Sequence, residues 1–205
     1  MKNFDKQDAY KNLERVNFWI GNSDTKTSFL LAFIGIIVGF SISNSKFIDS
    51  IIIAIKEINE QFCSFDFDVK FSLSITLILG VIIFILFLGL TLVNLLSVIT
   101  SRVNPTEDEL SKKRVISNSN LFFGTIAVNK GEYASIPENN FEEYLERINN
   151  LAEENLYDDI NSQVYINSMI CKKKFSFYLK GIKWLKRAAI LAIIIIPVFL
   201  FLSSL

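Results

Sequence analysis

The longest uncharged stretch of the chain, Phe71 to Thr100, constrains the fold more than any other feature. Its thirty residues contain no Asp, Glu, Lys or Arg. As a helix it would reach about 45 Å, whereas the hydrocarbon core of a bilayer is about 30 Å thick. A soluble domain of this size has no need for a helix that is apolar on every side. We therefore expect a transmembrane helix over 71–100, with its surplus turns extending past the cytoplasmic face toward Pro105.

Two further apolar stretches predict two more membrane spans, over 27–45 and 188–205. In the first, Gly35 and Gly39 form a G-x-x-x-G pattern, where small residues let another helix backbone approach closely. That helix can belong to the same chain or to a second copy. The last stretch is near the lower length limit for spanning. A helical pattern that begins near Leu156 is expected to run directly into it.

The segments that flank the first span predict amphipathic helices. Residues 1–26 hold a helical apolar stripe over 5–20, which can pack on a partner helix or lie on the membrane. Residues 46–70 predict a second amphipathic helix on the outer membrane surface. Between 21 and 28 we expect a helix junction, because Gly21 can interrupt a helix and Ser23 can cap the next one.

The long segment 101–187 is more polar than the spans, and its composition predicts a small domain. A capping-box pattern opens a short helix near Thr106. A polar stretch with Gly124, Gly131 and Pro137 follows, and helical periodicity returns from Asn139 onward. The predicted fold is therefore an all-α membrane protein, with three transmembrane helices and a small, mostly helical cytoplasmic domain between the second and third.

The distribution of basic residues predicts the orientation. The segment 101–187 carries thirteen Lys and Arg, whereas 46–70 carries three together with five acids. Loops rich in Lys and Arg stay in the cytoplasm. The N-terminus and 101–187 are therefore expected in the cytoplasm, with 46–70 and the C-terminus outside. Cys63 and Cys171 would then lie on opposite sides of the membrane.

The composition argues against several function classes. The chain has no His, only two Cys, and equal numbers of acidic and basic residues. Catalytic triads and zinc sites are therefore not expected, and there is no charge footprint for a nucleic-acid polymer. No phosphate-binding Gly loop occurs, and the three spans lack the central ionisable residues that transporters use. We expect neither an enzyme nor a carrier, and no metal or cofactor.

The best candidate for ligand binding lies in 112–124. Cations there could meet a phosphate, amides could form hydrogen bonds, and aromatic rings could stack on a base. These candidates are Lys112, Lys113, Arg114, Asn118, Asn120, Phe122 and Phe123. The simpler interpretation is a basic strip beside anionic lipid, followed by a loop anchored by its Phe residues. At the membrane edge, Asp24 and Lys26 form either a switch or an ordinary helix junction.

Several of these stretches together resemble the Pycsar effector transmembrane family. They are Trp19 followed by Asp24-Thr25-Lys26, then NLFFGTIA (120–127), FEEYLERI (141–148) and DDINSQVYINSMICKKKF (158–175). Ser28 stands where the family more commonly has alanine.

The resemblance implies an antiphage effector of the bacterial inner membrane, paired with a pyrimidine cyclase. Cyclic CMP or cyclic UMP would activate it, and it would then impair the membrane and abort infection. Assembly of copies through the first span would make it a homo-oligomer. Two alternatives stay open: a membrane scaffold for a soluble partner, and a constitutive small toxin.

Overall fold

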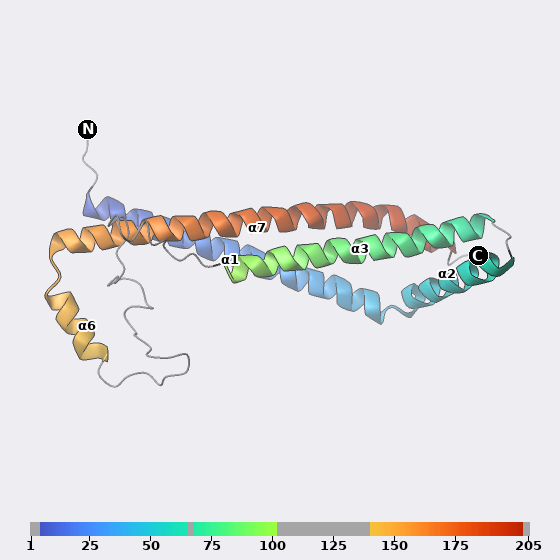
Figure 1. The fold of residues 1–205 in the computed structure, drawn as a ribbon, viewed down its shortest axis with the longest axis horizontal. Helices are drawn as coiled ribbons and strands as arrows, with labels where there is room; N and C mark the ends of the chain where they lie inside the picture. The colour runs from blue at the N-terminus through green and yellow to red at the C-terminus, as the bar shows by residue number, and fades with distance from the viewer. Residues whose placement is uncertain (1–4, 65–67, 102–139, 203–205) are drawn as a thin grey trace. The chain divides into compact units, whose positions relative to one another are not determined.

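The computed structural model describes residues 5–64, 68–101 and 140–202, and these residues form helices without any strand. In chain order the helices are α1 (Lys6–Ser43), α2 (Ser45–Ser64), α3 (Val69–Ile99), α6 (Asn140–Asn149) and α7 (Glu153–Leu202) (Figure 1). Three of them, α1, α3 and α7, are long and apolar enough to cross a membrane. The protein is therefore an all-α membrane protein with three spans, as the uncharged stretches predicted.

The chain divides into two compact units. The membrane unit comprises Asp24–Thr100 with Phe175–Leu205, and the head unit comprises Met1–Ser23 with Ser101–Lys174. Helices α1 and α7 each contribute residues to both units. The helical runs expected from Asn139 and from Leu156 into the last span are confirmed as α6 and α7.

The helices of the membrane unit pack through a regular seam. Along α3, one row of buried and half-buried side chains lies at three- and four-residue steps, and buried Gly80 lies beside it. The row consists of Ser74, Leu77, Val81, Phe84, Leu88, Thr91, Leu95 and Val98. The same steps occur along α7 at Tyr178, Gly181, Leu185, Ala188, Ala192, Ile195 and Phe199. Steps of three and four residues keep one face of each helix turned toward its neighbours. The membrane unit is therefore a helical bundle.

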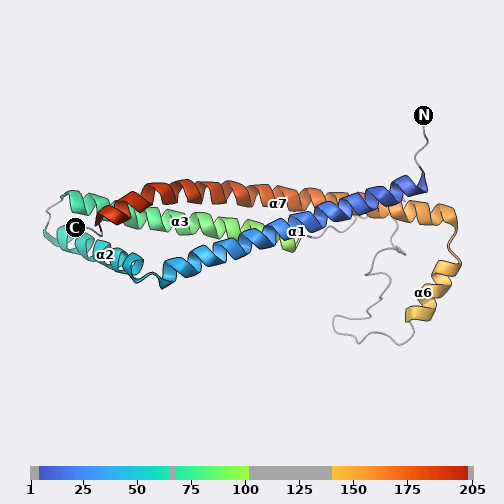
Figure 2. The same ribbon diagram turned by 180° about the vertical axis from the view of Figure 1, so that it is seen from behind.

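Two glycines allow α3 and α7 to approach closely. A Cβ at Gly80 would lie 2.7 Å from Ile195 Cδ1, and a Cβ at Gly181 would lie 2.9 Å from Leu95 Cδ2. Because Gly80 meets Ile195 and Gly181 meets Leu95, the two helices run antiparallel, side by side (Figures 1 and 2). Ile34 of α1 completes the core with Leu88, Leu95 and Ala188.

Replacing Gly80 by valine should therefore destabilise the bundle, because the new side chain meets Ile195. Overpacking of this kind costs about 1–3 kcal/mol. The matched control is Gly89→Val on the same helix, where an added Cβ meets nothing within 4 Å. Thermal unfolding in detergent, followed by helical circular dichroism, should show a lower midpoint for Gly80→Val alone. Equal midpoints for the two variants would contradict the close approach.

The helix junction expected at 21–28 is wrong, because α1 continues through it from Lys6 to Ser43. An isolated Gly costs a helix only about 1 kcal/mol, and the buried seam of α1 is unbroken there. Ser23 and Thr27 are 2% and 0% exposed, and they continue the three- and four-residue steps toward Ile34. Their side chains pack within the protein and do not cap a second helix.

Helix α2 and the first turns of α3 form a hairpin beyond the end of α1. Helix α2 packs on α3, its Phe47 also contacts Phe199 of α7, and its Ser50 and Ala54 are buried. Asp68 caps α3: its Oδ1 accepts from the Phe71 N–H at 2.9 Å, which lowers the pKa of this carboxyl below its ordinary value. The cap therefore persists at neutral pH and is lost only when the pH falls through that lowered pKa.

The surplus length of α3 lies mainly in this hairpin. Leu88 of α3 packs at the level of Ile34 of α1. The last residue of α1, Ser43, comes nine residues after Ile34. Because the two helices run in opposite directions, Ser43 lies near Leu79, nine residues before Leu88. About ten residues of α3, or roughly 15 Å, therefore extend beyond α1 at the α2 end. At the other end α3 stops at Ile99. The expected extension past the cytoplasmic face toward Pro105 stays a prediction. The amphipathic helix expected over 46–70 is confirmed as α2.

Candidate functional site

The predicted ligand segment lies outside the residues that the structure describes. All seven of its candidates fall within 102–139: Lys112, Lys113, Arg114, Asn118, Asn120, Phe122 and Phe123. Their role in ligand binding stays a prediction. The short helix expected near Thr106 falls in the same range.

Within the head unit, α7 carries a set of buried polar side chains. Asp159 is 1% exposed, Ser162 5%, Gln163 6% and Lys174 5%. Asp159, Gln163 and Lys174 lie on one face of the helix, at separations of four and eleven residues. Buried charges and amides are stabilised only when they are paired or hydrogen-bonded. This face gives the head unit a polar interior of carboxylate, hydroxyl, amide and ammonium groups.

The sequence interpretation missed this buried face. Among the adjacent Lys172, Lys173 and Lys174, only Lys174 is buried, whereas the other two are exposed. The signal was available in the spacing, because Asp159, Gln163 and Lys174 share a helical face with apolar Ile166 and Ile170. In a helix outside the membrane, polar residues on such a face can point into a core.

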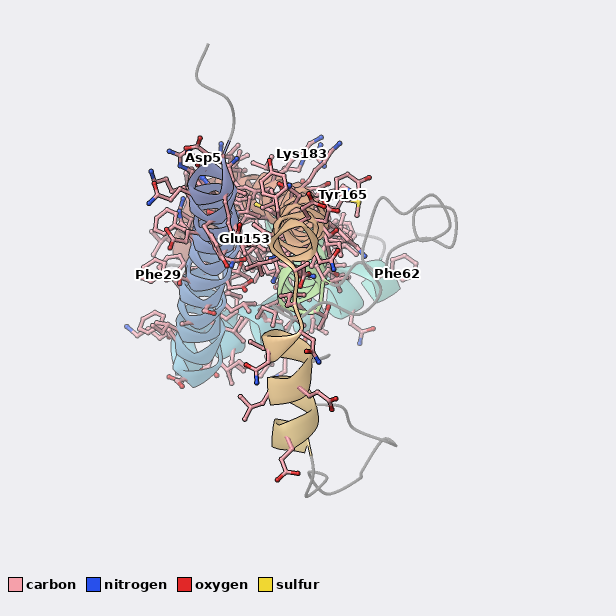
Figure 3. The ribbon with its side chains drawn as sticks, turned by 90° about the vertical axis from the view of Figure 1, so that its left-hand side faces the viewer. Asp5, Phe29, Phe62, Glu153, Tyr165 and Lys183 are labelled. Carbon is pink, nitrogen blue, oxygen red and sulfur yellow. The ribbon has the colours of Figure 1, made fainter. Side chains whose placement is uncertain are left out.

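The first half of α1 pairs with the first half of α7 in the head unit. Lys6 Nζ and Glu153 Oε1 form an ion pair at 3.0 Å, and Asn167 Nδ2 donates to Asn17 Oδ1 at 2.8 Å. Figure 3 labels Glu153 at the start of α7 and Asp5 at the start of α1. Ala9 and Ile160 are fully buried. The two segments run parallel, and packing on a partner helix is thus the role of the N-terminal stripe.

The predicted switch residues lie where the two units divide. Asp24 is half-buried and is the first residue of the membrane unit, and Lys26 is exposed. The next turn of α1 presents Phe29 to the surroundings with 72% of its surface exposed (Figure 3). No described acidic side chain lies within ion-pair distance of Lys26. The switch role of Asp24 and Lys26 stays a prediction.

The small residues of the first span face away from the rest of the chain. Ala32, Gly35, Gly39 and Ser43 are all exposed, and an added Cβ at Gly35 or Gly39 meets nothing within 4 Å. The buried seam of α1 uses the opposite positions, such as Leu30 and Ile34. None of the described helices of this chain therefore packs on the G-x-x-x-G stripe.

The membrane unit also contains an apolar cavity of about 320 Å³. Side chains from α1, α2, α3 and α7 line it, including Phe40, Phe47, Phe84 and Phe199. The Phe47 and Phe199 rings pack with their centroids 5.8 Å apart. Since no charged group lines this cavity, it suits an apolar molecule and does not suit a cyclic nucleotide. Among the described residues no group of acidic and Cys side chains is placed to hold a metal ion.

The fold and the surfaces described above define a class: an all-helical membrane protein with three spans and no described catalytic constellation. Comparison with known proteins identifies a family within this class. The family model of the Pycsar effector protein domain matches residues 8–204. A relative, the Pycsar effector protein GmPycTM of Gulbenkiania mobilis, is 35% identical over 198 residues, which cover 96% of this chain and 94% of the relative. No solved structure matches the chain.

The chain belongs to the Pycsar effector protein family. The match spans both units, from the first helix to the last membrane span. The resemblance seen in the sequence is therefore confirmed over nearly the whole chain.

Proposed function

We propose that this protein is an antiphage effector of the bacterial inner membrane, which cyclic CMP or cyclic UMP switches from a harmless to a membrane-impairing state. Membership of the Pycsar effector family across residues 8–204 carries the proposal. A cyclase encoded nearby would supply the nucleotide on infection. Impairment of the membrane would then stop growth before phage are released, without catalysis by the effector itself.

The division of the chain into two units supports this mechanism. The head unit offers polar groups that a nucleotide requires, whereas the membrane unit is apolar and contains the spans. We place nucleotide binding in the segment 101–187, on the cytoplasmic side, with Lys112, Lys113 and Arg114 meeting the phosphate. Helices α1 and α7 belong to both units, so a change in the head unit can bias the packing of the spans. The nucleotide shifts that balance only by its differential affinity for the two states.

Two surfaces are assigned to the membrane step. The exposed Ala32, Gly35, Gly39 and Ser43 stripe would join copies into a homo-oligomer. Asp24 and Lys26 would act as a switch at the membrane edge, where the two units divide. The absence of charges at the centre of the described spans favours general disruption or a loose pore over a selective channel.

Growth of cells that express the chain without its cyclase tests the proposal. Membrane-permeable cyclic CMP or cyclic UMP should arrest growth within minutes, and cyclic AMP at the same concentration should not. Arrest on expression alone would show a constitutive toxin. Continued growth under every condition would leave the membrane scaffold as the better account.

A further inference from the structure

Helix α7 carries four exposed cations in the membrane unit: Lys180, Lys183, Lys186 and Arg187. Lys180, Lys183 and Arg187 follow one another at three- and four-residue steps and share one outward face, beside which Lys186 lies. Figure 3 shows Lys183 extending away from its helix. The Arg187 guanidinium lies 4.4 Å from the Trp184 ring centroid. Trp184 in turn packs on Phe87 of α3 at 5.5 Å, so the aromatic pair holds Arg187 in place.

Helix α1 shows how deep these cations lie. No charged residue occurs on α1 between Lys26 and the last residue of the helix, Ser43, and this stretch rises about 26 Å. That is close to the thickness of the hydrocarbon core. Lys26 therefore marks one edge of the membrane on α1.

Because α1 packs on α7, the position of the membrane edge on α1 gives the depth of the cations on α7. Ile34 packs in one core with Ala188, and Ile34 lies about 12 Å along α1 from Lys26. Arg187 is therefore about 10 Å inside the edge that Lys26 marks, and Lys183 about 5 Å inside it. Lys180 lies at the edge itself, next to Gly181. The face thus runs from the head-group level into the hydrocarbon.

Nothing described in the chain neutralises these charges. Among the described acidic residues of the membrane unit, only Asp24 lies at this end; the others are in α2 or cap α3. No carboxylate of the described residues is within ion-pair distance of the three cations. A cation at this depth is costly unless its side chain reaches the head groups or an anion comes to it. The bilayer supplies such an anion in the phosphate of an anionic phospholipid.

We propose that Lys180, Lys183 and Arg187 bind the head group of an anionic phospholipid and draw it below the level of the surrounding lipid. The bilayer is then thinner beside α7 than elsewhere. A standing thin region of this kind would be the place where membrane impairment starts. The binding itself rests on the membrane unit alone and requires no nucleotide.

The two tryptophans of the chain, Trp19 and Trp184, allow a direct test. In full-length Trp19→Phe protein, fluorescence reports only on Trp184. The protein is reconstituted into phosphatidylcholine vesicles that contain a small share of a lipid brominated near the head group. This brominated lipid is phosphatidylglycerol in one set of vesicles and phosphatidylcholine in the other. Each nearby cation attracts an anionic lipid about fivefold. Brominated phosphatidylglycerol should therefore quench Trp184 at several-fold lower content than brominated phosphatidylcholine.

Two triple variants separate this site from general charge attraction. Lys180→Gln, Lys183→Gln and Arg187→Gln together should remove the preference for phosphatidylglycerol. The matched control, Lys46→Gln, Lys56→Gln and Lys70→Gln, removes as many charges at the opposite end and should keep it. Equal quenching by both lipids in the Trp19→Phe parent would overturn the proposal whatever the folding of the variants. Loss of the preference on adding inorganic phosphate would also overturn it, because the face would then be a surface anion site.

Discussion

Replacing Gly35 by leucine is expected to abolish nucleotide-dependent killing while the protein still folds in the membrane. The side chain would project into open space from a helix face that packs on no described part of the chain. Folding should therefore be unaffected, but a second copy could no longer approach along Gly35 and Gly39. Overpacking costs about 1–3 kcal/mol, which lowers assembly by roughly tenfold or more. Colony counts after nucleotide treatment measure the effect.

The matched control for Gly35→Leu is Gly89→Leu. Gly89 is also exposed and an added Cβ there also meets nothing within 4 Å, but no small-residue stripe surrounds it on α3. Chemical crosslinking should show that Gly35→Leu loses the oligomer whereas Gly89→Leu keeps it. Killing by Gly35→Leu at the level of the parent would show that the stripe faces lipid and has no part in assembly.

Changing Lys112, Lys113 and Arg114 together to alanine should raise the nucleotide concentration for half-maximal killing by tenfold or more. Hydrogen bonds to a charged group contribute about 1.5–3 kcal/mol each, so the loss of one phosphate contact gives that shift. The dose response to cyclic CMP and cyclic UMP measures it. Alanine at Lys46, Lys56 and Lys70 removes the same charge elsewhere and should leave the dose response unchanged. An unaltered response of the first variant would remove this basic cluster from the site.

The spans and most helices could be predicted from the sequence because their signals are local. Thirty uncharged residues dictate a membrane helix wherever the rest of the chain lies, and the pattern from Leu156 onward has no breaker before Pro197 apart from Gly181. The continuity of α1 through Gly21 was not predictable from local residue preferences. It depends on a packed seam in which Ser23 and Thr27 are buried, so tertiary contacts outweigh the weak helix preference of one glycine.

Features that depend on the partner helix also could not be predicted from the sequence. Nothing in the sequence distinguishes Gly80 and Gly181, which allow close helix contact, from Gly89, which faces open space. The depth of Arg187 follows only from the packing of Ala188 with Ile34. Lys174 is buried although its neighbours are exposed, because a helix turns each successive residue by 100 degrees. The predicted ligand residues of 112–123 fall outside the described residues, so their role rests on chemistry and on the family.

The two units give a physical basis for an effector that is silent until it is triggered. The bundle of the membrane unit is regular and well packed, as a stable resting state requires, while its G-x-x-x-G face is left uncovered by the described chain. In the proposed mechanism, a nucleotide bound to the head unit changes which packing of the spans is favoured only by its differential affinity for the two states. A simple membrane anchor would not need the uncovered small-residue face.

The central claim is that one chain both senses the nucleotide and breaches the membrane. Purified protein in vesicles loaded with a potassium gradient and a voltage-sensitive dye tests it directly. Cyclic CMP or cyclic UMP, added on the side that carries the head unit, should collapse the potential, whereas cyclic AMP should not. A potential that survives both pyrimidine nucleotides, in vesicles where the head unit is accessible to protease, would contradict the account.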